Sequence, residues 1–309
     1  MDARSLTAAG LVTGYALDAA FGDPQRGHPV ALFGRVASAL EQRVWADSRP
    51  RGTAYAATCV GAAAALGALT AAATRRRPLA RVAATALATW TVLGGRGLAG
   101  EGEAMAVRLE AGDLSAARRR LGHLCGRDAT ALDELGLARA ATESIAENTS
   151  DAVVAPLLWG AVAGLPGLLG YRALNTLDAM VGHRTRRFTR FGWASARGDD
   201  LANLVPARAG ALLTAVCAPV VGGSPRRALA ARRRDAARHP SPNAGQIEAA
   251  FAGALDVRLG GVNSYAGQVE DRGTLGAGRP PDVRDLRRAV RLSRAAGLAA
   301  LALAVAVAR

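Results

Sequence analysis

A run of carboxylates with helical spacing is the first feature of this sequence that could do chemistry. Four side chains follow one another at steps of four residues and share one face if the segment is helical: Arg139, Glu143, Glu147 and Asp151. Carboxylates one turn apart repel each other unless water solvates them or a cation lies among them, and magnesium prefers oxygen ligands. The stripe leads directly into the apolar run AVVAPLLWGAVAG, where a charge is costly unless it serves a function. We therefore weigh a metal site against a solvated helix face.

A second acidic group follows that apolar run. It contains Asp178 and the adjacent pair Asp199 and Asp200. Adjacent aspartates can supply two ligands to one magnesium ion, and nearby arginines can hold phosphate oxygens in bidentate pairs. The alternative for the adjacent pair is a helix N-cap, because aspartate accepts hydrogen bonds from free backbone N–H groups.

The basic residues narrow the classes of function. The sequence contains no lysine, which excludes a P-loop, a Schiff base and a lysyl-adenylate intermediate, so arginine must bind any phosphate. The net charge of +14 raises the question of nucleic acid. The arginines are spread over most polar loops without interleaved aromatic residues, so we expect no nucleic-acid partner and instead arginines that face anionic lipid. The three cysteines lack CxxC spacing and the four histidines are far apart, which gives no sign of a zinc site.

Hydropathy indicates the elements that must position these groups. Half of the 309 residues are hydrophobic but only 4% are aromatic, and mean hydropathy is positive. Four runs approach the ~20 residues that cross a bilayer, namely 53–74, 79–100, 152–171 and 204–223. The last run, GLAALALAVAVA, is shorter, and the N-terminal run is expected to remain as a membrane-associated helix. We predict an all-α, polytopic helical protein of the cell membrane, with about four to five membrane-embedded helices plus polar helical loops. It would form one integral-membrane domain over residues 1–309.

The run 152–171 poses a topological conflict. If it crossed the bilayer completely, the two acidic groups would emerge on opposite sides and could not share one ligand. Pro156, Gly160, Gly164 and the Pro166-Gly167 pair interrupt it. We therefore expect it to be re-entrant or broken, which is tolerated where protein covers the backbone.

Two turn-rich segments carry further candidate side chains. Asp23 and His28 lie in GDPQRGHPV, either as plain turn residues or as part of a substrate-binding loop. In 241–267, Ser-Pro-Asn predicts a helix start, Gln246 to Leu259 an amphipathic helix, and two glycines its end. That segment is either a simple cap helix or a cover for a large substrate.

Taken together, several motifs resemble one known family. They are GDPxxxHPV (22–30), GRDAT (126–130), ESIAENTSDAVVAPLLW (143–159), YRALNTLDAMVGHR (171–184), ARGDDLANLVPAR (196–208) and SPNAGQIEAAFAGALDVRLGGVNSYAG (241–267). Their order and sequence are similar to the CobD/CbiB family of cobalamin biosynthesis, from about residue 18 to about residue 290. The resemblance implies a membrane-bound ligase, dependent on ATP and Mg²⁺, that joins adenosylcobyric acid to aminopropanol, supplied as its phosphate ester, to form an amide. It also leaves room for contact with other membrane enzymes of the corrin pathway.

The residue types allow roles to be assigned for such a reaction. A carboxylate needs activation, for which we expect an acyl phosphate, and the charge of the triphosphate needs neutralisation. We expect catalytic roles for Glu143, Glu147 and Asp200. The expected metal ligands are Glu147, Asp151, Asp178, Asp199 and Asp200. The expected ATP or phosphate ligands are Arg139, Arg172, Arg184 and Arg208. The expected substrate contacts are Asp23, His28, Asn148, Asn175, Asn203, Asn243, Asn263 and Tyr265, with the last three around the corrinoid.

Two other classes remain as alternatives. NTLD and GDD faintly resemble the aspartate-rich motifs of magnesium-dependent membrane prenyltransferases, but such an enzyme needs an apolar groove and more spans. A transporter with intramembrane acids predicts an internal repeat, and the sequence shows none.

Overall fold

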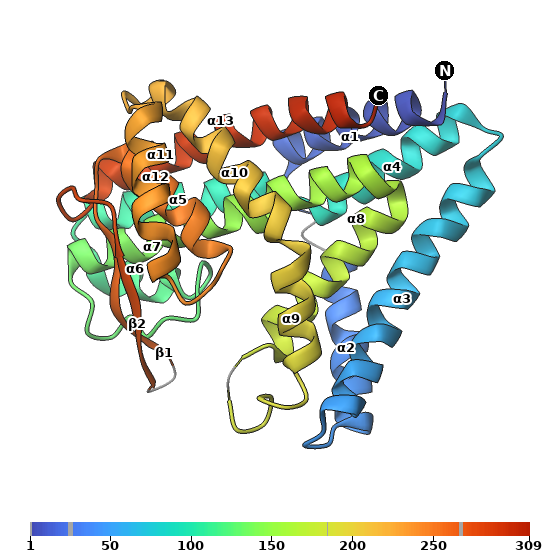
Figure 1. Ribbon diagram of the computed structural model, residues 1–309, viewed down its shortest axis with the longest axis horizontal. Coiled ribbons are helices and arrows are strands. Elements are labelled where there is room, and N and C mark those ends of the chain that lie inside the picture. Colours follow the sequence, from blue (N-terminus) through green and yellow to red (C-terminus); the bar gives the residue numbers. More distant parts are fainter. Residues whose placement is uncertain (1, 24–26, 184, 266–267) are drawn as a thin grey trace. The chain divides into compact units, whose positions relative to one another are not determined.

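The computed structural model describes residues 2–23, 27–183, 185–265 and 268–309, and these are mostly helical (Figure 1). The elements in chain order, with short 3-10 or π-helical turns marked η, are α1 (Ala3–Phe21), α2 (Pro29–Val44), α3 (Arg49–Thr74), α4 (Pro78–Val92), α5 (Gly95–Glu110), α6 (Leu114–Leu121), α7 (Glu134–Thr149), η1 (Ser150–Val154), α8 (Ala155–Val181), α9 (Trp193–Ala202), α10 (Leu204–Cys217), η2 (Ala218–Val221), α11 (Pro225–Asp235), η3 (Ala236–Arg238), α12 (Ala244–Leu255), β1 (Leu259–Tyr265), β2 (Gln268–Leu275) and α13 (Val283–Val307). The predicted all-α class is confirmed.

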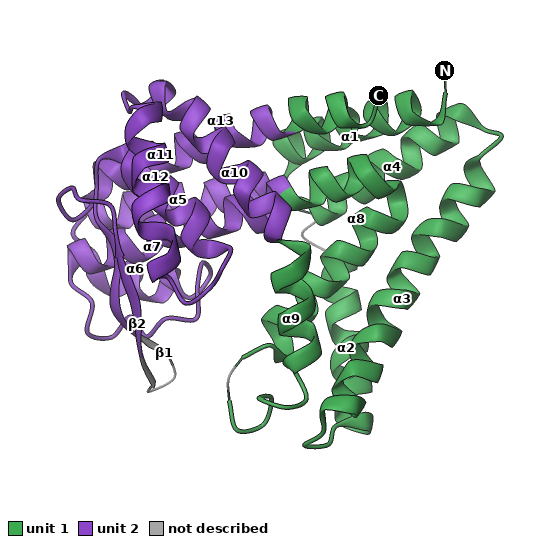
Figure 2. Ribbon diagram, in the orientation of Figure 1, with its two compact units in different colours: residues 1–94, 155–203, 301–309 green, residues 95–154, 204–300 purple. Residues whose placement is uncertain are grey.

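The elements group into two compact units, each built from segments distant in sequence (Figure 2). Unit 1 comprises residues 1–94, 155–203 and 301–309, and unit 2 comprises residues 95–154 and 204–300. The two acidic groups of the sequence therefore fall in different units, since Glu143 belongs to unit 2 and Asp199 to unit 1.

Small residues allow close helix packing in unit 1. Helix α1 packs against α4, where a Cβ atom added to Gly10 would lie 2.4 Å from the Cβ of Thr85. One turn further on, a Cβ added to Gly14 would lie 2.4 Å from the Cβ of Thr89. The glycine and alanine content of the sequence thus lets backbones approach as in membrane helix pairs.

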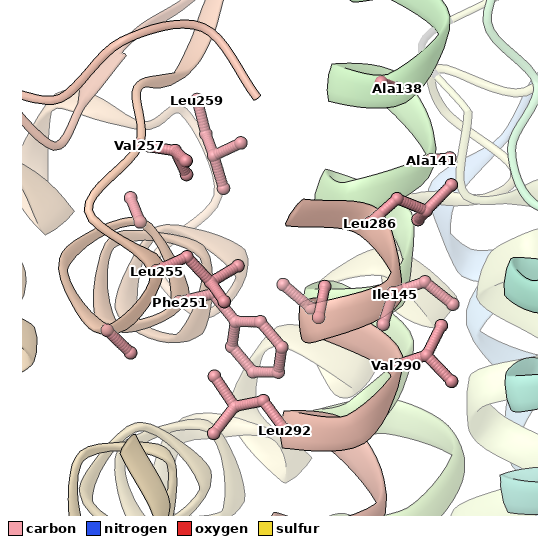
Figure 3. Close-up of a cluster of buried hydrophobic side chains, with 14 of the residues drawn as sticks. Ala138, Ala141, Ile145, Phe251, Leu255, Val257, Leu259, Leu286, Val290 and Leu292 are labelled. Atoms are coloured by element: carbon pink, nitrogen blue, oxygen red, sulfur yellow. The ribbon is translucent and has the colours of Figure 1, made fainter. Parts of the chain in front are cut away.

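Unit 2 has a hydrophobic core at the junction of α7, α12 and α13 (Figure 3). Ile145 of α7, Phe251 of α12 and Val290 of α13 are fully buried in it. Leu109 and Leu121 join the same cluster from α5 and α6. This core fixes α7, and with it the carboxylate stripe, against α12.

Among the described residues, four helical stretches are long and apolar enough to cross a membrane, which agrees with the predicted number. They are Arg49–Thr74, Glu134–Val181, Leu204–Val221 and Val283–Val307. One detail of the prediction is wrong. The run 79–100 is not one span, because α4 ends at Val92 and a new helix begins at Gly95. The short C-terminal run is the end of the 25-residue helix α13 and so belongs to a full-length candidate span.

Helix α8 is interrupted, as the proline and glycine pattern predicted. Gly164 has φ 61° and ψ −145°, which are not helical angles, and Pro166 follows. A π-helical turn, η1, also precedes α8. The segment is therefore helical but not one straight rod.

The helix predicted for Gln246 to Leu259 is shorter than expected, and a small antiparallel sheet follows it. Helix α12 starts after Asn243 as expected but ends at Leu255, where Asp256 adopts a left-handed conformation. Gly260 and Gly261 lie in β1, which pairs with β2 and has an irregularity between Gly260 and Val262. The two glycines do not stop a helix. They give the strand its local bend.

Candidate functional site

The carboxylate of Glu143 lies in the interior of unit 2 and is bound from two sides. Arg127 donates from Nη2 to Oε2, and both side chains are only 2% exposed. The backbone N–H of Gly260 donates to Oε1 at 2.7 Å. A buried carboxylate without such partners would be costly, so the pair is mutually dependent. The solvated-face interpretation of the stripe is wrong at this position.

Arg139 connects the same carboxylate region to strand β1. Its Nη1 donates to the carbonyl oxygen of Gly260 at 2.6 Å, and its Nη2 to Oδ1 of Asn263 at 3.4 Å. Its Nε lies 3.9 Å from Oε1 of Glu143. A Cβ atom added to Gly260 would lie 2.0 Å from the carbonyl oxygen of Gly273, so only glycine fits there. The structure thus brings together Arg139 and Asn263, which are 124 positions apart in the chain.

A buried charge cluster next to this group was missed in the sequence. Glu248 of α12 is fully buried, with Oε1 3.6 Å from Nε2 of His239 and 3.9 Å from Nη1 of Arg272. Burial, reinforced by the negative charges of Glu143 and Glu147, raises the pKa of Glu248 well above its usual range. Burial and the Arg272 charge lower the pKa of His239 to about 4.

Signals for the missed residues existed. Glu248 is the only charged residue in the mostly apolar helix α12, AGQIEAAFAGAL. A single acid in such a helix indicates a buried carboxyl group with a specific partner. Arg127 belongs to the GRDAT motif, but its partner Glu143 is 16 positions away and no local pattern links them.

In unit 1, Asp199 lies at the centre of a hydrogen-bonded chain of neutral groups. Its Oδ2 accepts from Nδ2 of Asn203 at 3.0 Å and its Oδ1 from Nδ2 of Asn175 at 3.3 Å. Tyr171 in turn donates its hydroxyl to Oδ1 of Asn203 at 2.9 Å. Burial and the Asp178 carboxylate raise the pKa of Asp199 to about 7, against the opposing effect of the two amides. The group can therefore change charge near neutral pH.

The N-cap alternative for the aspartate pair is wrong. Helix α9 begins at Trp193 with Gly192 in the N-cap position, so Asp199 and Asp200 lie inside the helix. The two side chains have different surroundings, because Asp199 is buried and Asp200 is half-buried, 3.4 Å from Nη1 of Arg197.

The remaining residues of the stripe do not all share one environment. Glu147 is half-buried and contributes to the field at Glu248. Asp151 lies in the π-helical turn η1, so the α-helical step of four ends before it and the predicted common face does not extend to this residue. Asn148 donates from Nδ2 to the carbonyl oxygen of Ser144 at 2.9 Å.

The other predicted arginines and loop residues are spread over both units. Nη1 of Arg208 donates to the carbonyl oxygen of Leu204 at 2.8 Å, and Nη1 of Arg172 to Oδ1 of Asn175 at 3.4 Å. Arg184 and the side chain of Tyr265 lie outside the described part of the chain.

The turn before α2 is a capping structure. His28 occupies the N-cap position, where its Nδ1 accepts from the backbone N–H of Val30 at 3.1 Å. Asp23 lies 4.0 Å from Nε2 of the same histidine. At the start of α12, Asn243 holds the N-cap position and is buried.

These donors fit a magnesium ion that arrives with phosphate rather than a preformed cage. Within the described residues, no three His, Cys, Asp or Glu side chains form a group that could hold a metal by themselves. Magnesium is commonly held by one or two carboxylates together with substrate phosphates. The proximity of Asp178 and Asp199, which raises the pKa of the latter, is a repulsion that a cation would relieve.

Unit 2 also contains a pocket beside Arg139. Its volume is about 320 Å³, and the residues around it include Asp133, Arg258, Gly261 and Thr274. Two arginines and one carboxylate therefore face one small space close to the Glu143 group.

The fold and these groups define a helical membrane protein with buried acid and arginine clusters, and comparison with known proteins gives its family. Residues 11–293 match the family model described as CobD/CbiB protein. "Cobalamin biosynthesis protein CobD" of Mycobacterium tuberculosis (strain ATCC 25618 / H37Rv) is 58% identical over 300 residues, which cover 96% of this chain and 95% of that protein. Proteins of the same name from Geobacter metallireducens and Rhodobacter capsulatus are 46% and 44% identical, each over 93% or more of both chains.

No solved structure matches the chain. The extent of the family and sequence matches shows that the chain belongs to the CobD/CbiB family of cobalamin biosynthesis proteins. The resemblance noted in the sequence is thereby confirmed.

Proposed function

We propose that the protein is an ATP- and Mg²⁺-dependent carbon–nitrogen ligase of the cell membrane. It would join the propionate carboxylate of adenosylcobyric acid to the amine of aminopropanol phosphate, or of aminopropanol, giving adenosylcobinamide phosphate or adenosylcobinamide respectively. Family membership supports the pathway, and the sequence resemblance supports the reaction. The observation that carries the chemistry is Asp199, a buried carboxylate with a pKa of about 7.

Amide formation needs an activated acid and a free amine. Transfer of the γ-phosphoryl group of ATP to the carboxylate gives an acyl phosphate and ADP, and attack by the amine expels inorganic phosphate. The attacking nitrogen must lose a proton, and a base whose pKa lies near the working pH is best suited to accept it. Asp199 has that property, and Asn175 and Asn203 hold its oxygens in place.

Charge neutralisation falls to magnesium and arginine in this lysine-free chain. Asp178 and Asp200 of unit 1 would hold the magnesium ion, while Asp199 accepts the proton; the other two predicted ligands, Glu147 and Asp151, belong to unit 2. The ion supplies neutralisation of phosphate oxygens when bound. The predicted phosphate-binding arginines are Arg139, Arg172, Arg184 and Arg208.

Family membership favours this reaction over the two alternatives. The match covers residues 11–293 with a cobalamin biosynthesis family, whereas the resemblance to prenyltransferases rests on two short acidic motifs. A transporter moves its substrate without converting it, whereas a biosynthesis family is expected to catalyse a reaction.

Reconstitution tests the proposal directly. Purified full-length protein is incubated with adenosylcobyric acid, aminopropanol phosphate, ATP and Mg²⁺, and the amide product and ADP are measured by mass spectrometry. We expect both to form in equal amounts over many turnovers. When the amine is omitted, we expect no amide and at most one ADP per enzyme molecule, from formation of the acyl phosphate. Absence of the amide together with absence of substrate-dependent ATP turnover would overturn the proposal.

A further inference from the structure

The pocket of about 320 Å³ in unit 2 combines two guanidinium groups with one carboxylate. Arg139 reaches it from α7, Arg258 from the segment just before β1, and Asp133 from the N-cap of α7. Thr274 of β2 and Gly261 of β1 complete the wall that lies across from α7. The site is therefore built from the start of α7, the segment before β1 and the two strands rather than from one loop.

Acidic side chains of the protein do not neutralise all of the positive charge in this pocket. Glu143, the nearest acid to Arg139, is already committed to Arg127 and to the N–H of Gly260. Arg139 donates hydrogen bonds from Nη1 to Gly260 and from Nη2 to Asn263. Its Nε, 3.9 Å from Glu143, makes no hydrogen bond. Arg258 is exposed, and among the described residues its guanidinium has no ion-pair or hydrogen-bond partner. An anion in the pocket would meet two guanidinium groups.

The bend in β1 brings the arginine and the backbone close together. Gly260 and Gly261 both have positive φ, at 80° and 86°. A Cβ atom added to Gly261 would lie 3.1 Å from Nη1 of Arg139. The absence of a side chain there leaves the guanidinium open toward the pocket.

Asp133 gives the pocket a second, opposite charge. Its Oδ1 caps α7 by accepting from the N–H of Gly136 at 2.8 Å, and its side chain is exposed. Its other oxygen is available to a cation. A ligand that carries a phosphate at one end and an ammonium at the other matches this arrangement of charges.

We propose that this pocket binds the small aminoalkyl phosphate ester, an inference that rests on the proposed ligase function. Arg139 and Arg258 bind the phosphate dianion, and Asp133 binds the ammonium group. The volume is at the lower limit of small-molecule sites, which span ~300–1,000 Å³, and no aromatic side chain is among the described residues that line it. A small zwitterion fits this space better than a nucleotide with its base and ribose.

Binding measurements on the full-length protein test the site. Calorimetric titrations with aminopropanol phosphate, inorganic phosphate, aminopropanol and ATP are compared for the wild type, R258Q and the control R226Q. Arg226 is also an exposed arginine of unit 2 without a side-chain partner in the described residues, and it lies outside the pocket. R258Q should weaken aminopropanol phosphate and inorganic phosphate by about 10- to 100-fold, as expected for one charge-assisted hydrogen bond. R226Q should match the wild type.

A second variant separates the two ends of the ligand. D133N keeps a residue that caps helices as well as aspartate does, so the fold should persist. It should weaken aminopropanol phosphate by about 10-fold and leave inorganic phosphate unchanged.

Three outcomes would overturn the assignment. They are no binding of aminopropanol phosphate or phosphate by the wild type, equal binding by R258Q and R226Q, or loss of ATP binding in R258Q with aminopropanol phosphate unaffected. If the wild type forms the amide while R258Q binds normally, the site fails and the ligase function stands. If the phosphate ester binds as expected but no amide forms, the function fails and the site stands.

Discussion

The two units place a buried carboxylate in opposite electrostatic surroundings. Glu143 in unit 2 faces a guanidinium and a backbone N–H, and it is 2% exposed. Asp199 in unit 1 is 8% exposed and faces two neutral amides and a second carboxylate. A paired charge is fixed, because either partner alone would be stranded. A charge among amides and a like charge can be given up or exchanged, which is what a proton acceptor or a metal ligand requires.

The largest effect should follow from breaking the fixed pair. R127M removes the guanidinium that binds Oε2 and leaves Glu143 buried with only the N–H of Gly260 and Arg139, whose Nε lies 3.9 Å from Oε1. We expect a loss of about 3–5 kcal/mol in the free energy of unfolding. Thermal unfolding of purified protein in detergent, monitored by circular dichroism, would measure it.

The double variant R127M/E143Q gives the control. Glutamine keeps the shape of Glu143 but carries no charge to strand, so the double variant should recover most of the loss. If it is no more stable than R127M alone, the cost does not come from an unpaired charge.

The next effect concerns Asp199 and should appear in activity rather than stability. D199N keeps the size and removes both the charge and the proton-accepting oxygen. We expect a loss of about 100-fold or more in kcat for amide formation, the range typical of a lost general base. Unfolding temperature near neutral pH should be unchanged or higher. A large drop in stability with normal activity would place Asp199 with Glu143 as a structural acid.

The pH dependence of stability sharpens the same contrast. The pKa of Asp199 is about 7 in the folded protein and about 4 in the unfolded chain, so the folded state binds the proton more tightly. Its contribution to stability is therefore complete below pH 4 and is lost as pH rises through 7. The difference in unfolding temperature between D199N and wild type should grow in favour of D199N over this range. A constant difference would contradict the raised pKa.

The smallest effect is expected at Glu248. Burial raises the pKa of Glu248 well above its usual range and so favours the protonated carboxyl group, which glutamine resembles. E248Q should change the free energy of unfolding by less than about 1 kcal/mol, whereas E248A leaves a cavity and should cost about 2 kcal/mol or more. Equal and large losses in both variants would show that Glu248 is ionised and paired with Arg272.

Local patterns predicted much of the fold. The helix start after Asn243 and the break in α8 both depend on residues within a few positions of each other. The predicted end of one helix failed because Gly260 and Gly261 suit a helix stop and a strand bend equally well. Only the pairing of β1 with β2 decides between them.

The candidate site was less accessible from sequence. Spacing identified Glu143 and Arg139, but the partner of each comes from a distant segment, Arg127 in one case and Gly260 in the other. Glu248 was missed because its helix was expected to be amphipathic with a solvated face, whereas the core of unit 2 surrounds it. The partners and the environment of these charged groups are determined by tertiary burial and not by the local sequence pattern.

The break at Gly164 limits how far helix α8 can extend across the hydrocarbon layer of a membrane. At 1.5 Å per residue, the arm of α8 before the break, 155–163, is about 14 Å long and the arm after it, 165–181, about 26 Å. The later arm is shorter than the ~30 Å hydrocarbon layer, and the earlier arm is long enough only together with η1 and α7, which continue it toward the N-terminus. Pro166 lacks an N–H group, which leaves one fewer donor to satisfy at the break. The remaining freed backbone groups must find partners in protein or water, which makes residues 163–167 a place where lipid cannot be the neighbour on every side.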